Sequence, residues 1–120
     1  MKAAAPAPGP MVQGFGAGGF RIDGDHYRSA LLTVKAAADW SPPPLSDLSL
    51  ETLQALLEPS PEFILLGTGA RLTRPPVALT RALEAQSLGL EPKDSRAAAR
   101  AWGVLRSEGR QIAAALYPLD

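Results

Sequence analysis

The chain has 120 residues, no cysteine, and 12 basic against 12 acidic side chains, so its formal net charge is zero. The lack of cysteine excludes disulfides, thiolate nucleophiles, iron–sulfur clusters and cysteine-ligated zinc, and it fits a cytoplasmic protein. Balanced charge gives no overall attraction for nucleic acid or for an anionic membrane. A hydrophobic content of 46% with 20% charged residues is typical of one globular domain.

Residues 1–18 are rich in proline, alanine and glycine, which predicts a flexible tail before a single domain at 19–120. Prolines interrupt the apolar run that a signal peptide would need, and no apolar stretch approaches the ~20 residues that span a bilayer. We therefore expect no membrane insertion. Residues 14–19 match the dinucleotide fingerprint G-x-G-x-x-G, but without the strand before it and the helix after it that the motif requires.

A β-hairpin is predicted at the start of the domain. Residues 20–22 alternate apolar and polar, and Asp23 and Gly24 form a dipeptide favoured in type I′ turns. The return strand is expected within 27–34. Residues 36–45 include three consecutive prolines, which fit neither a helix interior nor a sheet ladder, so a loop is expected there.

The rest of the chain predicts alternating helices and strands. Ser49 is a candidate N-cap for a short helix, and Pro75 with Pro76 suits the first turn of a second. A third helix is capped at 94–95. Pro92 removes one ladder donor, which places its strand at a sheet edge. Strands are expected at 62–66, 88–93 and 111–117. This spacing predicts parallel pairing with right-handed crossovers in an α/β fold with a mixed sheet.

Two strand-to-helix turns are candidates for a ligand site. Parallel strands end at the same edge of a sheet, where ligands bind in open α/β folds. Helix N-termini at that edge favour an anion, and Thr68 and Ser95 would add hydroxyl donors. Close packing at the glycines and ordinary helix capping explain the same residues equally well. The candidates are Gly67, Thr68, Gly69, Asp94 and Ser95.

Other side chains carry weaker signals. Trp40, in the proline-rich segment, is a candidate for a partner surface, although covering a sheet edge is an equally ordinary role for it. Trp102 lies on the apolar side of its helix and is expected in the core. The single histidine, His26, follows a turn, and no metal-ligand spacing surrounds it. No catalytic residue set is found.

Four arginines lie between residues 96 and 110, namely Arg96, Arg100, Arg106 and Arg110. Among alanines they are typical of a solvated helix face. The one aromatic residue among them, Trp102, is expected in the core and not beside the arginines, so nucleic-acid binding is not predicted.

Three blocks of sequence in this order resemble a known family. The blocks are residues 19–24 with 27–32, residues 65–70, and residues 108–116 with Pro118. From about Val12 onward the chain is similar to the Mth938-like family, also called the DUF498 family. That resemblance implies a three-layer α/β fold with a five-stranded mixed sheet, an N-terminal β-hairpin, crossover helices and the penultimate strand at the edge. The last point agrees with the argument from Pro92.

The family includes small bacterial and archaeal proteins of unknown function and a mitochondrial assembly factor for respiratory complex I. Its members often carry Thr-Tyr-Asn or Thr-Phe-Asn where this chain has Ala101, Trp102 and Gly103. The aromatic residue is kept but the flanking polar groups are lost, which favours packing over a site at that position.

Two functions follow from these observations. The resemblance and the lack of catalytic residues favour a non-enzymatic, assembly-factor-like protein with a protein partner, contacted near Trp40. The alternative is a binder of a small anionic ligand or nucleotide, or an enzyme not otherwise recognisable, that uses residues 67–69. Neither function calls for a cofactor or a metal, and a homo-oligomer is compatible with both.

Overall fold

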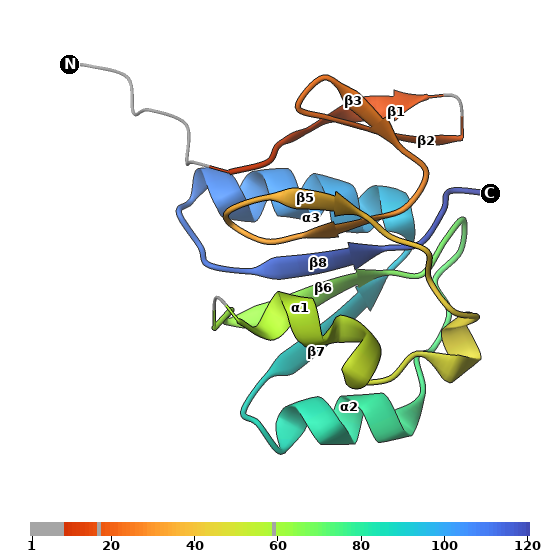
Figure 1. Ribbon diagram of the computed structural model, residues 1–120, viewed down its shortest axis with the longest axis vertical. Coiled ribbons are helices and arrows are strands. Elements are labelled where there is room, and N and C mark those ends of the chain that lie inside the picture. Colours follow the sequence, from red (N-terminus) through yellow and green to blue (C-terminus); the bar gives the residue numbers. More distant parts are fainter. Residues whose placement is uncertain (1–8, 17, 59) are drawn as a thin grey trace.

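A computed structural model of the protein describes residues 9–16, 18–58 and 60–120. A five-stranded sheet runs through its centre in the order β5-β4-β8-β6-β7 (Figure 1). Its strands are β4 (Ala30–Leu32), β5 (Ala37–Asp39), β6 (Phe63–Gly67), β7 (Gly89–Lys93) and β8 (Ala113–Leu116). The penultimate strand of the chain, β7, lies at the edge. The expectation from Pro92 and from the family resemblance is therefore confirmed.

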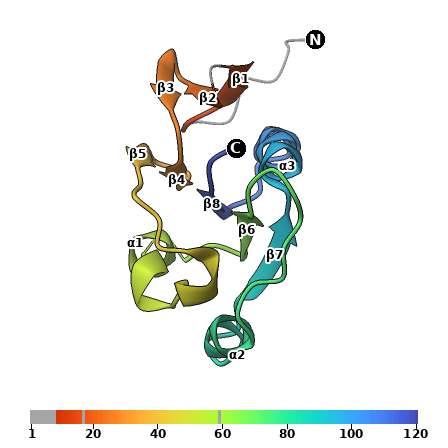
Figure 2. The same cartoon turned by 90° about the vertical axis from the view of Figure 1, so that its right-hand side faces the viewer.

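The sheet is mixed, as predicted. Strand β6 pairs in parallel with β7 and β8, whereas β4 pairs antiparallel with β8 and β5. Two helices make the crossovers, α2 (Val77–Glu84) between β6 and β7 and α3 (Ser95–Ser107) between β7 and β8. Figure 2 shows α3 on one side of the sheet and α2 with α1 (Gln54–Leu57) on the other. None of the described helices is long and apolar enough to cross a membrane.

A second, three-stranded sheet lies beside α3. Its strands are β1 (Val12–Gly16), β2 (Gly19–Ile22) and β3 (Asp25–Tyr27), in the order β1-β2-β3. The predicted turn is present: Asp23 and Gly24 both have positive φ, 50° and 88°, as a type I′ turn requires. The return strand is divided, because β3 stays in the small sheet while β4 joins the large one.

Strand β1 lies within the segment predicted to be a flexible tail. Residues 12–16 pair with β2, and the ring of Phe15 packs on Phe20 with centroids 6.1 Å apart. Trp102 Nε1, 2.9 Å away, donates a hydrogen bond to the Pro10 carbonyl. A glycine-rich strand has a weak local signal, so only these distant partners define it. Residues 1–8 lie outside the described part of the chain.

Two further elements differ from expectation. Strand β5 forms inside the predicted loop, because its backbone pairs with β4 just before the prolines. The helix predicted from Ser49 begins instead as the 3₁₀ turn η2 (Glu51–Leu53) and continues as α1. Another 3₁₀ turn, η1 (Leu45–Asp47), precedes it. Short, weakly capped helices of this kind depend on packing more than on propensity.

The apolar core is divided by the central sheet into two clusters. Alternate residues of β8 face opposite sides, with Ala114 and Leu116 toward α3 and Ala113 and Ala115 toward α1 and α2. Because both faces are covered, the central strands read as continuous apolar runs. Trp102 is the largest fully buried side chain on the α3 side. Its predicted place in the core is confirmed.

Candidate functional site

The two predicted turns meet at one edge of the central sheet. Strands β6 and β7 are parallel in the register Gly67 to Lys93, so residues 67–69 and 94–95 follow them side by side. Helix α3 begins at Ser95. The fold thus brings the five candidate residues together. Their polar groups could bind a ligand or form hydrogen bonds within the protein.

Ser95 joins three segments of backbone. Its hydroxyl oxygen accepts a hydrogen bond from the Gly69 amide and donates one to the Tyr117 carbonyl, both at 2.8 Å. The side chain has no exposed surface. A Cβ at Gly67 would lie 2.8 Å from this hydroxyl, so glycine is needed there for close packing.

Thr68 and Asp94 are also engaged with backbone. The Thr68 hydroxyl donates to the Arg71 carbonyl at 2.6 Å and accepts from the Thr73 amide at 2.9 Å. Asp94 is the N-cap of α3, accepting from the Ala97 amide at 2.9 Å. The hydroxyl groups of Thr68 and Ser95, which were predicted as donors to an anion, therefore form hydrogen bonds within the protein. Anion or nucleotide binding at this edge stays a prediction, which melting curves with phosphate and nucleotides would test.

Trp40 lies at a groove on another part of the surface. Its half-buried ring meets the ring of Tyr117 edge to face, with centroids 5.1 Å apart and an interplanar angle of 76°. The groove has a volume of about 570 Å³. It is lined by Arg28, Ser29, Asp39, Trp40, Ser41, Pro42 and Pro118.

Hydrogen bonds fix the walls of this groove. The Ser29 hydroxyl donates to the Trp40 carbonyl at 2.6 Å, and the Tyr117 hydroxyl donates to the Pro43 carbonyl at 2.8 Å. Burial, with the nearby charge of Asp47, raises the pKa of Tyr117 to about 12. Tyr117 is thus a neutral donor at physiological pH, and it holds the proline-rich segment against the sheet.

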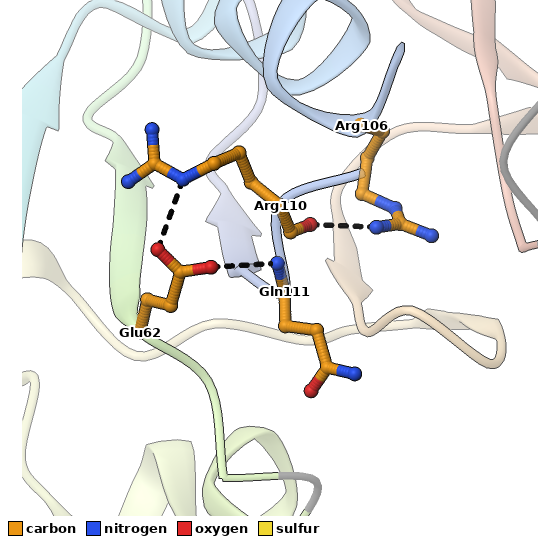
Figure 3. Close-up of polar contacts among 4 residues, drawn as sticks. All are labelled: Glu62, Arg106, Arg110 and Gln111. Carbon is orange, nitrogen blue, oxygen red and sulfur yellow. Dashed lines mark hydrogen bonds and ion pairs between the residues drawn. The ribbon is translucent and has the colours of Figure 1, made fainter. Parts of the chain in front are cut away.

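The four arginines of the third-helix region do not form one solvated face. Arg106 is only 4% exposed, and its guanidinium donates to the Arg110 carbonyl at 2.6 Å. Arg110 donates to Glu62 at 2.9 Å, while the second carboxylate oxygen of Glu62 accepts from the Gln111 amide (Figure 3). These contacts join the end of α3 to the start of β6. The prediction of a solvated face is therefore wrong for Arg106, which is buried, whereas Arg110 lies beyond the end of α3 and is partly exposed.

The other two arginines, Arg96 and Arg100, are exposed and lie against an aromatic ring. Their guanidinium carbons are 5.8 Å and 5.6 Å from the ring centroid of Phe15. This arrangement was not predictable from local sequence, because Phe15 belongs to a strand far away in the chain. A period-four spacing of arginines on one helix face was the only local signal.

His26 is exposed on β3. Within the described residues, no group of three or more histidine, cysteine, aspartate or glutamate side chains is placed to hold a metal ion.

Comparison with known proteins extends these observations. An uncharacterized protein of Rhodobacter capsulatus is 37% identical over 90% of this chain and 84% of that protein. The NADH dehydrogenase (ubiquinone) 1 alpha subcomplex assembly factor 3 of Danio rerio is 33% identical over 92% of this chain. The match spans 65%, or just under two thirds, of that assembly factor. A solution structure from Bordetella pertussis, described as a Mth938-like domain, superposes with a TM-score of 0.78 at 26% identity, covering 99% of this chain and 91% of that chain.

The family model described as "Protein of unknown function (DUF498/DUF598)" matches residues 12–117. This match begins with the first residue of β1 and ends one residue after β8. It therefore covers both sheets and all the helices described above. On this evidence, together with the Mth938-like fold, the chain belongs to the DUF498 family.

Proposed function

We propose that this protein is a non-enzymatic interaction protein, of the assembly-factor kind, and that it receives a protein partner in the groove beside Trp40. The Danio rerio relative, named as an assembly factor, supports the general role. We choose this surface because the half-buried Trp40 ring is held edge to face against Tyr117 at the side of an open groove.

A tryptophan in such a place suits protein recognition. Large aromatic side chains contribute most to binding when a pocket already orders them, because little side-chain entropy remains to be lost. The groove also carries one positive and one negative side chain, because Arg28 and Asp39 are among its lining residues. A partner with an apolar anchor and a polar rim fits this composition. We place the protein in the cytoplasm, which subcellular fractionation would test.

The test is capture of the partner from native lysate with tagged protein, followed by mass spectrometry. Trp40→Ala removes the anchor, whereas Ser41→Arg fills the groove from an exposed position. Ser46→Arg is the matched control, because Ser46 is exposed outside the groove lining. We expect a stoichiometric partner with the wild type and Ser46→Arg that is lost with the two groove variants. Equal capture by all four folded proteins would reject this surface.

A further inference from the structure

A second groove lies between strand β1 and helix α3. It has a volume of about 200 Å³ and is lined by four consecutive strand residues, 12–15, together with Ala99 and Arg100. Strand β1 is at the edge of the small sheet. An edge strand presents unpaired backbone groups, and four of the five residues of β1 line this groove.

The other sheet edges are less open to pairing. Strand β7 carries Pro92, which removes a donor, and β3 and β5 have only three residues each. Strand β1 has five residues, VQGFG, with neither proline nor a charged side chain. Proteins commonly protect exposed edges with such features. Strand β1 lacks proline, charge and shortness, and its one irregularity is a shift of register against β2 between Val12 and Gly14.

The register between β1 and β2 decides which side chains of β1 face the groove. Phe15 lies opposite Phe20, which is fully buried, and it packs against the cluster that includes Ala99 of α3. Gly14 lies opposite Arg21, which is exposed, so it belongs to the other face of the small sheet. Phe15 therefore lies on the face of β1 that looks toward α3.

The charge of the groove indicates what would enter it. Arg96 and Arg100 both lie against the ring of Phe15, and in the described part of the chain no carboxylate lies within 4.0 Å of either guanidinium. The nearby Asp94 is occupied with a backbone amide, that of Ala97. Arginines of this kind offer paired donors to carboxylates.

The basic character continues beyond Phe15. A second hollow, of about 240 Å³, is lined by Phe15, Gly16, Arg21 and His26. Arg21 and His26 are cross-strand partners on β2 and β3, and both are exposed. Arg21 lies on the face of the small sheet away from α3, so an occupant at the edge of β1 would meet arginines from both faces of the sheet.

We propose that the groove between β1 and α3 binds an extended acidic segment of a partner protein, which adds to β1 as a further strand. Its carboxylates contact Arg96 and Arg100, and an apolar side chain packs on Phe15. Strand addition supplies affinity through backbone hydrogen bonds, while side chains on one face supply specificity. The inference deepens the proposed interaction role by adding a surface distinct from the Trp40 groove and a class of partner.

A peptide is favoured over nucleic acid because the cationic area is small. Binding to a phosphate backbone gains affinity from many neutralised charges, and the chain has no net positive charge to add to these few groups. The free edge of β1 also has a natural complement in a polypeptide backbone, and phosphates have none of its alternating donors and acceptors.

The test uses the full chain and a random-peptide display library, with the selected peptide then titrated by NMR. We expect peptides rich in aspartate and glutamate that shift the amide signals of β1 and of the first half of α3. The double variant Arg96→Glu/Arg100→Glu should weaken binding at least tenfold. Phe15→Ala should weaken binding as strongly, since it removes the ring on which the peptide packs beside the two arginines.

Two controls keep the folded state and the charge comparable. Phe63→Ala removes a half-buried ring that lies under another arginine, Arg110, and Arg81→Glu reverses an exposed charge on α2. Both should bind as the wild type does. Selection of no peptide, selection of basic peptides, or affinity unchanged by Phe15→Ala would overturn the proposal. Preferential binding of oligo(dT) that depends on Arg96 and Arg100 would overturn it in favour of nucleic acid.

The result of the peptide experiment can be told apart from the result of the lysate capture that tests the proposed function. Capture from lysate detects a partner at any surface, whereas peptide selection with Phe15→Ala reports on this groove alone. A partner that is lost with Ser41→Arg but kept with Phe15→Ala would support the Trp40 groove and overturn the β1 proposal.

Discussion

The hydroxyl oxygen of Ser95 lies 2.8 Å from the amide nitrogen of Gly69, a residue 26 positions earlier in the chain. The same hydroxyl donates to the Tyr117 carbonyl. One buried side chain at the start of α3 therefore joins the turns after β6 and β8. This explains why a small hydroxyl residue and two glycines gather at the edge of the sheet without needing a ligand.

Ser95→Ala should destabilise the fold. It leaves the Gly69 amide and the Tyr117 carbonyl without their partner in a fully buried place, and an unsatisfied buried group costs about 1–3 kcal/mol. Urea unfolding measures the loss. Ser107→Ala is the control, because its hydroxyl donates to the Val104 carbonyl on the exposed end of the helix. Equal stability of the two variants would contradict this account of Ser95.

Trp102→Phe should loosen the first strand selectively. The indole donates to the Pro10 carbonyl, and this bond ties the segment before β1 to α3. Its loss should cost about 1–3 kcal/mol and speed amide exchange in β1 more than in β6. Hydrogen exchange read by mass spectrometry measures both. Leu90→Ala lies on the opposite side of the sheet and should not speed exchange in β1 more than in β6. If both variants show the same exchange pattern, the hydrogen bond from Trp102 is not what orders β1.

Tyr117 should make stability fall at alkaline pH. Because burial raises its pKa from 10.0 to about 12, the fold favours the neutral phenol. That contribution is fully present below pH 10.0 and is lost as the pH rises toward about 12. Urea unfolding across this range should show a smaller alkaline loss for Tyr117→Phe. Tyr27→Phe removes the other tyrosine of the chain and should keep the wild-type loss.

Glu62 should make the stability of the fold depend on pH in the acidic range. Its pKa is lowered by the hydrogen bonds from the Arg110 side chain and the Gln111 amide, so the fold favours the carboxylate. The contribution is present above the unfolded pKa near 4.5 and is lost as the pH falls. Glu62→Gln should therefore lose less stability on acidification than the wild type does. The effect should be small because the pair is solvent-exposed; Glu108→Gln, exposed at the helix end, should follow the wild type.

Much of the fold was predictable because its signals are local. Asp23 and Gly24 specify a turn by their tolerance of positive φ. Asp94 specifies a helix start by capping, and Pro92 specifies an edge by its missing donor. Apolar runs long enough for a buried strand predicted β6 and β8. Each of these features acts within a few residues and needs no knowledge of the rest of the chain.

The candidate site was only partly predictable. The sequence placed Gly67 and Ser95 at one edge of the sheet, because parallel strands require it. It did not tell whether their polar groups face a ligand or the protein, since that depends on Tyr117 far along the chain. Nor did it separate Arg106, which is buried, from Arg96, which is exposed.

The sequence by itself determined the α/β class, the mixed sheet, the edge position of β7 and the core position of Trp102. Periodicity, capping and the backbone limits of proline and glycine act locally, so these features are visible residue by residue. Only the tertiary structure decided that residues 12–16 form a strand, that the hydroxyls of Thr68 and Ser95 bond to backbone, and that Phe15 lies against Arg96 and Arg100. Each of these features depends on residues that are far apart in the chain and meet only on folding. Such contacts leave no local pattern in the sequence.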